Sequence, residues 1–446
     1  MTFSRRFSEY VISHRYEQMS ADAIMATKLA ILDWLGSAIA GGLEKPAKIL
    51  SETLNTFGGL PQSTNFVTFE KTSVHYASLI NGGASHILEL DDVHKASILH
   101  AGASIIPAAF AVAEWKQATG RELIEAVALG FEVAIRIGEA VSPSHYEIFH
   151  TTGTVGTFGA TVAVGKLLGL SVDEMVHALG SAGTQAAGLW EFIEDGAMSK
   201  QLHPAKACSN GLLAAALAKQ QFTAASQILE GRRGFFAGLV KEVKEELLFH
   251  RLGEGYKIME NTYKIHSCCR HIHPTLDCVQ EIFRENGSKI EEVERVVVET
   301  YQVALNITDK PDPRSVFESK FSLPYAAALM LVKGKTGLDE FTEENLFNPK
   351  IRRLTEKVNL RVDPALDALY PNLWPSRVTV HYADGTKLTK ETHAPKGDPE
   401  NPAGELELRG KFLGLAGKVI SEKQAKDIAD TIMNLEDVEN VSTVFS

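Results

Sequence analysis

Cysteine is scarce in this chain: only four of its 446 residues are cysteines. Cys208, Cys268, Cys269 and Cys278 contain no C-x-x-C spacing, and a chain of this length does not need disulfides to stabilise it. We therefore expect reduced thiols and an intracellular, cytoplasmic location.

Long apolar runs are also missing. The longest, residues 101–113, is interrupted by Pro107 and falls short of the ~20 residues that cross a bilayer as a helix. Residues 1–16 mix charged with isolated apolar side chains, unlike the continuous apolar core of a secretory signal. We expect a soluble protein with no membrane partner.

Positive charge is the minority sign: 45 lysines and arginines stand against 56 aspartates and glutamates, a formal net charge of -11. A molecule with this excess repels nucleic acid and anionic membranes. We therefore expect no nucleic-acid partner, and any anion-binding site has to be a local cationic pocket.

Helical patterning dominates what the chain does contain. Its length exceeds one ordinary core, so we expect two domains. Apolar residues recur at helical spacing from residue 20 to 229, and the stripe at 24–39 stops at the glycines 41–42. These patterns predict a helical bundle. Two capping boxes mark further helix starts: Ser171 with Glu174, and Ser421 with Gln424.

The residue pattern changes after about residue 290, where β-branched residues alternate with charged residues. Residues 265–395 are typical of an α+β unit, and the tail from about 405 returns to helix. The Pro/Gly stretch 395–404 is the predicted junction. Strands are expected at 293–301, 377–382 and 386–392, with an Asp384-Gly385 hairpin turn between the last two, and helices at 324–332 and 342–358.

Two windows of this acidic chain carry basic residues and no acid, residues 196–229 and 261–276. Unopposed cations beside a cleft would supply the field that binds carboxylates. The alternative is that they are solvated or helix-terminal cations. The first window contains Lys200, His203 and Lys206, and the second contains Lys264, His266, Arg270, His271 and His273.

A third segment, residues 89–102, places Asp91 and Asp92 close to His94 and His100. Adjacent carboxylates point to different sides of the chain, so at most one faces a given pocket. That one could orient a histidine or act as a base. N-terminal capping of the following helix is the alternative for one of them.

Metal and phosphate motifs fit poorly. Residues 266–273 hold three histidines and two cysteines, but the distant second ligand pair of a zinc site is absent from the sequence, so we predict no metal. His145 and His150 lack the H-E-x-x-H pattern and are interpreted as flanking a pocket. The glycines 153, 156 and 159 do not have phosphate-loop spacing and favour close helix packing.

Taken together, seven segments spread over nearly the whole chain resemble the MmgE/PrpD superfamily, which includes 2-methylcitrate dehydratases, cis-aconitate decarboxylases and iminodisuccinate epimerases. Their order and separation carry the resemblance more than any single one. They are LDWLGSAIAG (32–41), HILELDDVHKASILHAGASIIPA (86–108), HTTGTVGTFGATVAVGKLLGL (150–170), GAMSKQLHPAKACSNG (196–211), YKIHSCCRHIHPTLD (263–277), KFSLPYAAALML (320–331) and PKGDPENP (395–402).

The resemblance implies a mainly α fold. A large all-helical domain would be built from both termini, residues 1–264 and 405–446, with a smaller α+β lid domain at 265–404. It also implies a homodimer and a substrate pocket between the helical domain and the lid.

Resemblance to the family's decarboxylase branch also implies which residues form the active site. His100 would be an acid or base oriented by Asp91 or Asp92, and Tyr325 a hydrogen-bond donor or proton carrier. Cys269 stands where that branch has a catalytic histidine. Lys200, Lys264 and Arg270 would bind carboxylates, and further substrate contacts are expected from His94, His203, His271 and His273.

The expected function is a cofactor-independent lyase of a small di- or tricarboxylate. The leading expectation for the reaction is dehydration of a 2-methylcitrate-like acid, a step of propionate metabolism. Alternatives are cis-aconitate decarboxylation, which Cys269 disfavours, epimerisation of a dicarboxylate such as iminodisuccinate, and a non-catalytic binding protein with the family fold.

Overall fold

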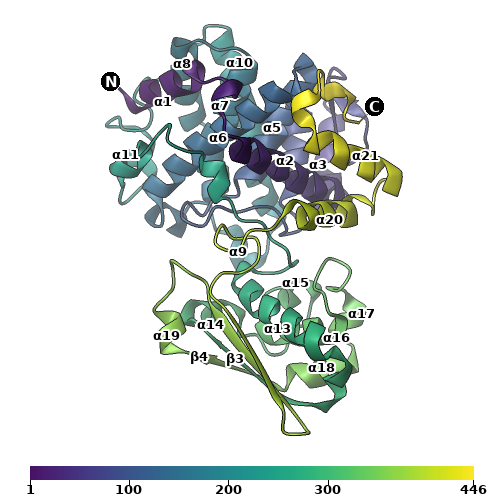
Figure 1. Cartoon of the computed structure of the whole chain (residues 1–446). Helices are drawn as coiled ribbons and strands as arrows, with labels where there is room; N and C mark the ends of the chain where they lie inside the picture. The colour runs from purple at the N-terminus through teal and green to yellow at the C-terminus, as the bar shows by residue number, and fades with distance from the viewer. Residues whose placement is uncertain (446) are drawn as a thin grey trace. The chain divides into compact units, whose positions relative to one another are not determined.

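The computed structural model describes residues 1–445 and separates into two compact units (Figure 1). The helical unit comprises Met1–Thr262 and the C-terminal residues from Gly404 on, and the α+β unit is Tyr263–Ala403. Because 58% of the chain is helical and only 9% is strand, the predicted fold class, mainly α with a smaller α+β part, is confirmed.

The helical unit is organised around long, almost wholly buried helices, among them α2, α5, α6 and α7. Apolar side chains surround these helices on all sides, which is what a helix inside a bundle requires. Both predicted capping boxes are present, at the starts of α8 and α21. Its main helices are α1 (Phe3–Ser13), α2 (Ala21–Gly41), α3 (Lys45–Asn55), α4 (Val74–Ser85), α5 (Ala101–Lys116), α6 (Gly120–Val141), α7 (Thr151–Leu167), α8 (Val172–Gly183), α10 (Leu202–Lys219), α20 (Glu405–Ala416) and α21 (Glu422–Met433).

Shorter elements complete this unit. They are the paired strands β1 (Ser63–Thr64) and β2 (Lys71–Thr72), and the short helices α9 (Phe192–Asp195), α11 (Phe235–Leu239) and α12 (Glu245–Leu248).

Close packing of α7 explains its glycines. A Cβ added at Gly159 would lie 2.6 Å from a side-chain atom of Ile105 in α5 and 2.8 Å from Ala134 in α6. At Gly156 it would lie 2.4 Å from Ser104 Oγ. Glycine therefore lets the helix backbones approach, and the predicted packing role is confirmed.

The α+β unit is built on one four-stranded sheet in the order β4-β3-β5-β6. β3 pairs parallel with β4 and antiparallel with β5, which pairs antiparallel with β6. Alternate residues of β5 are buried, so one face of the sheet packs into the core formed with α13 and α16. Its elements are α13 (His273–Asn286), β3 (Val293–Thr300), α14 (Gln302–Thr308), α15 (Val316–Ser319), α16 (Leu323–Lys333), α17 (Glu343–Leu346), α18 (Pro349–Thr355), β4 (Val358–Val362), α19 (Pro364–Asp367), β5 (Ser376–Tyr382) and β6 (Lys387–Thr392).

One prediction inside this unit needs correction. The helix expected at 342–358 consists of two short helices, α17 and α18, and its last residue, Val358, begins strand β4. Asn348, whose side chain caps α18, and Pro349 break the helical run. The parallel strand β4 was not expected.

One helix, α2, is long and apolar enough to cross a membrane by length and composition. In its most apolar window, 78% of the residues are buried inside the protein. This burial is the ordinary state of a core helix.

Candidate active site

A loop between α4 and α5 brings the main candidate residues together. His94 and Leu99 exchange backbone hydrogen bonds of 2.9 and 3.4 Å, which closes the loop just before His100. Glu89 (φ 58°) and Ile98 (φ 50°) adopt left-handed backbone conformations that non-glycine residues rarely occupy. Strained backbone of this kind concentrates at functional sites.

Within this loop, His86, Asp91 and His100 form what we call the histidine–aspartate cluster. The Nδ1 atom of His86 lies 2.6 Å from Asp91 Oδ2, and His100 Nδ1 lies 3.0 Å from the same oxygen. His86 and Asp91 are buried, whereas the side chain of His100 keeps 13% of its surface exposed. The cluster therefore presents one accessible imidazole backed by a buried carboxylate.

Among the described residues, three buried polar atoms of the cluster have no hydrogen-bond partner that meets the usual geometry: His86 Nε2, Asp91 Oδ1 and His100 Nδ1. The last of these nevertheless lies within ion-pair distance of Asp91. Leaving buried polar atoms unpaired costs about 1–3 kcal/mol each. Such a cost points to a functional site.

Burial and charge act in opposite directions on the cluster. Burial alone would raise the pKa of Asp91, but the neighbouring imidazoles of His86 and His100 outweigh it and hold the pKa well below its ordinary value. Burial lowers the pKa of His86 to about 4. At neutral pH the cluster thus contains a carboxylate and an uncharged His86.

Asp92 points elsewhere, as expected for the neighbour of Asp91. Its two carboxylate oxygens accept from the backbone N–H of Gly102, at 3.0 and 3.1 Å, in the first turn of α5, and Asn261 Nδ2 donates to it at 2.7 Å. Burial, and then the charge of Asp91, raise the pKa of Asp92 to about 7. Asp92 therefore has the capping role, and Asp91 faces the histidines.

A second imidazole pair adjoins the cluster. His150, at the start of α7, places its Nδ1 3.0 Å from Nδ1 of His203 in α10. The rings of His150 and His86 stack at 5.6 Å between centroids. Burial lowers the pKa of His203 to about 4, and that of His150 also lies well below its ordinary value because of burial. The pair is uncharged at neutral pH, so one imidazole donates to the other.

Lys200, just before α10, is paired with Glu89 of the strained loop. Both side chains keep 19% of their surface exposed. The first basic window is therefore not unopposed, because the compensating carboxylate comes from 111 residues away in the sequence.

His94 lies in a different polar network. Its Nδ1 is 2.9 Å from Ser97 Oγ, and its Nε2 is 3.5 Å from Glu260 Oε2 and 3.9 Å from Glu139 Oε1. Lys257 Nζ lies 2.9 Å from a carboxylate oxygen of each glutamate. The spacing of His94, Glu139 and Glu260 would suit a metal ion, but the lysine already supplies the positive charge.

The histidine–aspartate cluster also has metal-compatible spacing, since one ligand atom of each of its three residues lies within 4.8 Å of the others. Two imidazoles and a carboxylate suit Zn²⁺. A metal there would displace the proton that His86 shares with Asp91, so the present hydrogen bond and a metal are mutually exclusive.

In the α+β unit the predicted cation Arg270 is buried and paired with Asp398. Its Nη1 donates to His273 Nδ1 at 2.8 Å and to the Tyr263 and Lys396 carbonyls, each at 3.2 Å. The second basic window is thus also opposed, and Arg270 links the start of α13 to the loop after β6.

His271 and His273 have partners within this unit. His271 Nδ1 lies 2.7 Å from the Tyr301 hydroxyl, and its ring stacks on Trp374 at 4.4 Å. His273 Nε2 lies 3.2 Å from the Cys268 carbonyl oxygen. Burial lowers the pKa of His271 to about 4. Their substrate-binding roles stay predictions, and the present contacts favour structural ones.

Tyr325, at the start of α16, has a buried hydroxyl with no hydrogen-bond partner among the residues that the structure describes. Burial raises its pKa to about 12, so it is a proton donor at neutral pH. Lys264 is also buried. Cys269 is half-buried, and its backbone N–H donates to the Lys320 carbonyl at 2.8 Å. The predicted pocket shared with the helical domain stays a prediction.

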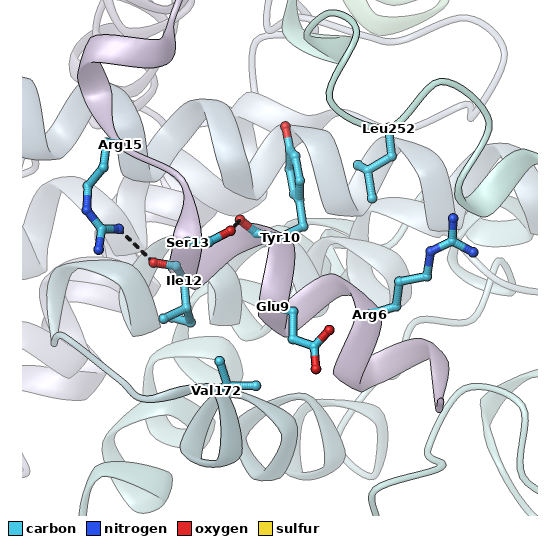
Figure 2. Close-up of a pocket in the computed structure, with 8 residues that line it drawn as sticks. All are labelled: Arg6, Glu9, Tyr10, Ile12, Ser13, Arg15, Val172 and Leu252. Atoms are coloured by element: carbon cyan, nitrogen blue, oxygen red, sulfur yellow. Dashed lines mark hydrogen bonds between the residues drawn. The ribbon is translucent and has the colours of Figure 1, made fainter.

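A surface hollow of about 690 Å³ lies elsewhere in the helical unit, between α1, the start of α8 and Leu252 (Figure 2). Arg6, Arg15 and Glu9 border it, and Arg15 donates to the Ile12 carbonyl at 2.7 Å. The hollow shares no residue with the histidine–aspartate cluster, so the catalytic assignment does not depend on it.

Sequence reasoning assigned no role to His86 or Glu89. Both lie inside the motif at 86–108 that carries the family resemblance, and that was the available signal. Neither the five-residue separation of His86 from Asp91 nor the distant pairing of Glu89 follows a helical or strand period, so spacing alone did not reveal them.

A partly exposed imidazole backed by a buried carboxylate, beside a lysine, is an arrangement suited to acid–base chemistry. Comparison with known proteins identifies the family. The MmgE/PrpD N-terminal domain matches residues 5–247, and the MmgE/PrpD C-terminal domain matches residues 266–437.

Curated relatives are similar over the whole chain or half of it. Cis-aconitate decarboxylase of Aspergillus terreus is 28% identical, covering 96% of this chain and 91% of the relative. Cis-aconitate decarboxylase of Homo sapiens is 25% identical, covering 94% and 89%. The 2-methylcitrate dehydratase of Escherichia coli (strain K12) is 23% identical, covering 51% and 50%.

The chain belongs to the MmgE/PrpD family. It is an enzyme of the lyase type, and the family supports carboxylates as its substrates.

Proposed function

We propose that the protein is a cofactor-independent lyase of a small di- or tricarboxylate in which His100 moves the proton. The observation that carries this proposal is the 3.0 Å approach of the accessible His100 to the buried Asp91. An imidazole beside a fixed carboxylate is a group that can accept a proton from a substrate and return it later.

Lys200 has the second role in this proposal, that of a carboxylate-binding cation. Its ammonium group lies beside an acid–base pair, where it would stabilise negative charge that develops next to a substrate carboxylate. The role is supported by its present partner, because Glu89, with which the ammonium group is paired, is itself a carboxylate. Lys264 and Tyr325 stay predictions for the same reaction.

Decarboxylation of a cis-aconitate-like acid is the first candidate reaction. Loss of CO₂ leaves an electron pair on carbon, which a conjugated carboxylate delocalises until an acid protonates that carbon. The share of each relative that the chain matches supports this candidate. The two decarboxylases are matched over 91% and 89% of their own length, whereas the dehydratase is matched over only 50%.

Dehydration of a 2-methylcitrate-like acid, which the sequence favoured, is the second candidate. Cys269 supports it, because a thiol replaces the imidazole expected at that position in the decarboxylase branch. Dehydration needs a base for the C–H proton and an acid for the departing hydroxyl group. His100 supplies the base, and Tyr325 is a candidate for the acid.

The test is incubation of the purified protein in D₂O with citrate, 2-methylcitrate, cis-aconitate and iminodisuccinate in turn, followed by NMR. Decarboxylation yields a product shortened by one carbon that carries deuterium, and dehydration yields an alkene. Epimerisation places deuterium at a stereocentre without loss of CO₂ or water. Binding of an acid without any turnover or exchange would mean a non-catalytic protein and contradict the proposal.

A further inference from the structure

His86 is the buried member of the histidine–aspartate cluster, with none of its surface exposed. Because burial lowers its pKa to about 4, it carries a single ring N–H at neutral pH. Asp91 is ionised and can only accept hydrogen bonds. The proton of His86 therefore lies on Nδ1, which donates to Asp91 Oδ2 at 2.6 Å.

The same oxygen faces His100 Nδ1 at 3.0 Å. If that nitrogen carried a lone pair, two electron-rich atoms would meet at contact distance in a buried site and repel each other. With a proton on Nδ1 the contact is attractive. His100 is thus held as the Nδ1–H tautomer, and Nε2 keeps the lone pair that a base needs.

We infer that His86 is a positioning residue, which anchors the Asp91 carboxylate so that His100 keeps the Nδ1–H tautomer and offers Nε2 to the substrate. This inference rests on the proposed function of His100. The unpartnered atom His86 Nε2 takes no part in it, since the anchoring uses only Nδ1.

The surroundings of His86 keep it in the donating form. The groups that face it are Asp91, His100, His150 and Lys200. Burial disfavours a second proton on His86, and the nearby Lys200 and His100 act in the same direction. The ring of His150, which stacks on His86, contributes to that burial. His86 therefore acts as a fixed dipole rather than as a second titrating base.

Two substitutions of similar polarity separate positioning from packing. In His86→Asn the side-chain amide can take the place of Nδ1 and still donate to Asp91, whereas in His86→Gln the amide reaches the place of Nε2. We expect His86→Asn to keep kcat/KM within about 3-fold of wild type and His86→Gln to lower it about 10- to 100-fold, the range found when a second-layer hydrogen bond is lost.

The pH profile provides a readout that packing would not change. Without the donor, the pKa of Asp91 rises, so in His86→Gln the acidic limb of kcat/KM should move to higher pH, and in His86→Asn it should stay in place. Nitrogen-15 NMR of labelled histidine, with the His100 signal assigned by substitution, should show Nδ1–H in wild type and His86→Asn and mixed tautomers in His86→Gln.

The tautomer measurement needs no substrate, so it can fail independently of the proposed reaction. The inference is overturned if His100 is the Nε2–H tautomer in wild type, or if both variants lose activity equally at every pH. It is also overturned if EDTA abolishes activity and Zn²⁺ restores it, because a metal would then bind the cluster in place of the proton.

Discussion

The histidine–aspartate cluster and the segment 264–273 contain the same kinds of side chain, yet they differ in how those side chains are satisfied. In the segment, Arg270 is paired with Asp398, and both His271 and His273 have partners. Among the described residues, both regions contain buried polar atoms without a hydrogen-bond partner, but in the segment these are Ser267 Oγ and Arg270 Nε, whereas in the cluster they belong to His86, Asp91 and His100. The difference teaches that neither an excess of base nor unsatisfied burial marks a site by itself, and that the unpartnered atoms have to belong to groups that can exchange a proton.

Substitution of His100 gives the largest expected effect and tests the cluster directly. His100→Ala should lower kcat by about 10²- to 10⁴-fold, the usual contribution of a general acid–base residue. Its thermal midpoint should fall much less than kcat does, because the substitution leaves the buried pair of His86 and Asp91 in place. Normal turnover in this variant would contradict the proposal that the histidine–aspartate cluster is the active site.

Substitution of Arg270 should give the opposite pattern. Arg270→Ala removes the buried cation that pairs with Asp398, which should lower the free energy of unfolding by about 3–5 kcal/mol in urea titrations. The double variant Arg270→Ala with Asp398→Ala should recover part of that loss. A raised KM at unchanged stability would instead support the substrate-binding role predicted from sequence.

Adjacent carboxylates should respond to pH with opposite signs. The folded pKa of Asp92 is about 7, against an ordinary 3.8. The folded protein therefore keeps a proton that the unfolded chain has released, and this group lowers the unfolding free energy by up to about 1.4 kcal/mol per unit as pH rises from about 4 to about 7. Asp92→Asn should flatten that slope in urea titrations across the window.

Asp91 is the matched control for this prediction. Its folded pKa is depressed, so its contribution to stability is present above the ordinary carboxylate pKa and is lost as pH falls. In Asp91→Asn the unfolding free energy should therefore fall less as the pH drops below about 4. The slope between pH about 4 and about 7 should stay in place. Identical profiles for the two variants would contradict the separation of their roles.

The smallest effect is expected for Ser171, a polar residue with a purely structural role, and it serves as a reference for the other substitutions. Ser171 accepts from the Glu174 N–H at 3.2 Å in the capping box of α8. Ser171→Ala should cost about 1 kcal/mol of unfolding free energy, with kcat/KM unchanged. A larger change in activity than in stability would show that distant structural groups also influence the cluster.

Fold class was predictable from the sequence because helical spacing, capping boxes and the Asp-Gly hairpin are local signals. Strand β4 was missed although its sequence, VNLRV, alternates apolar and polar residues as a half-buried strand does. Five residues are a short signal, and they directly follow a segment that was expected to be helical. The parallel partner β3, about 60 residues earlier along the chain, leaves no local pattern that would have corrected the choice.

The site was predictable only in part, for the same reason. His100 stands in one motif with Asp91 and Asp92 and was expected to act with one of the two. The partners of Lys200 and Arg270 lie 111 and 128 residues away, so a scan for basic windows treated both cations as unopposed. The choice between Asp91 and Asp92 needed the position of the α5 N-terminus, which side-chain alternation could not supply.

The ion pair of Lys200 with Glu89 means that the resting enzyme already holds a carboxylate of its own. If Lys200 binds the substrate, as we propose, an incoming acid has to exchange with this internal carboxylate, and a molecule with a single acidic group gains little from that exchange. We therefore expect a preference for acids that make a further contact elsewhere.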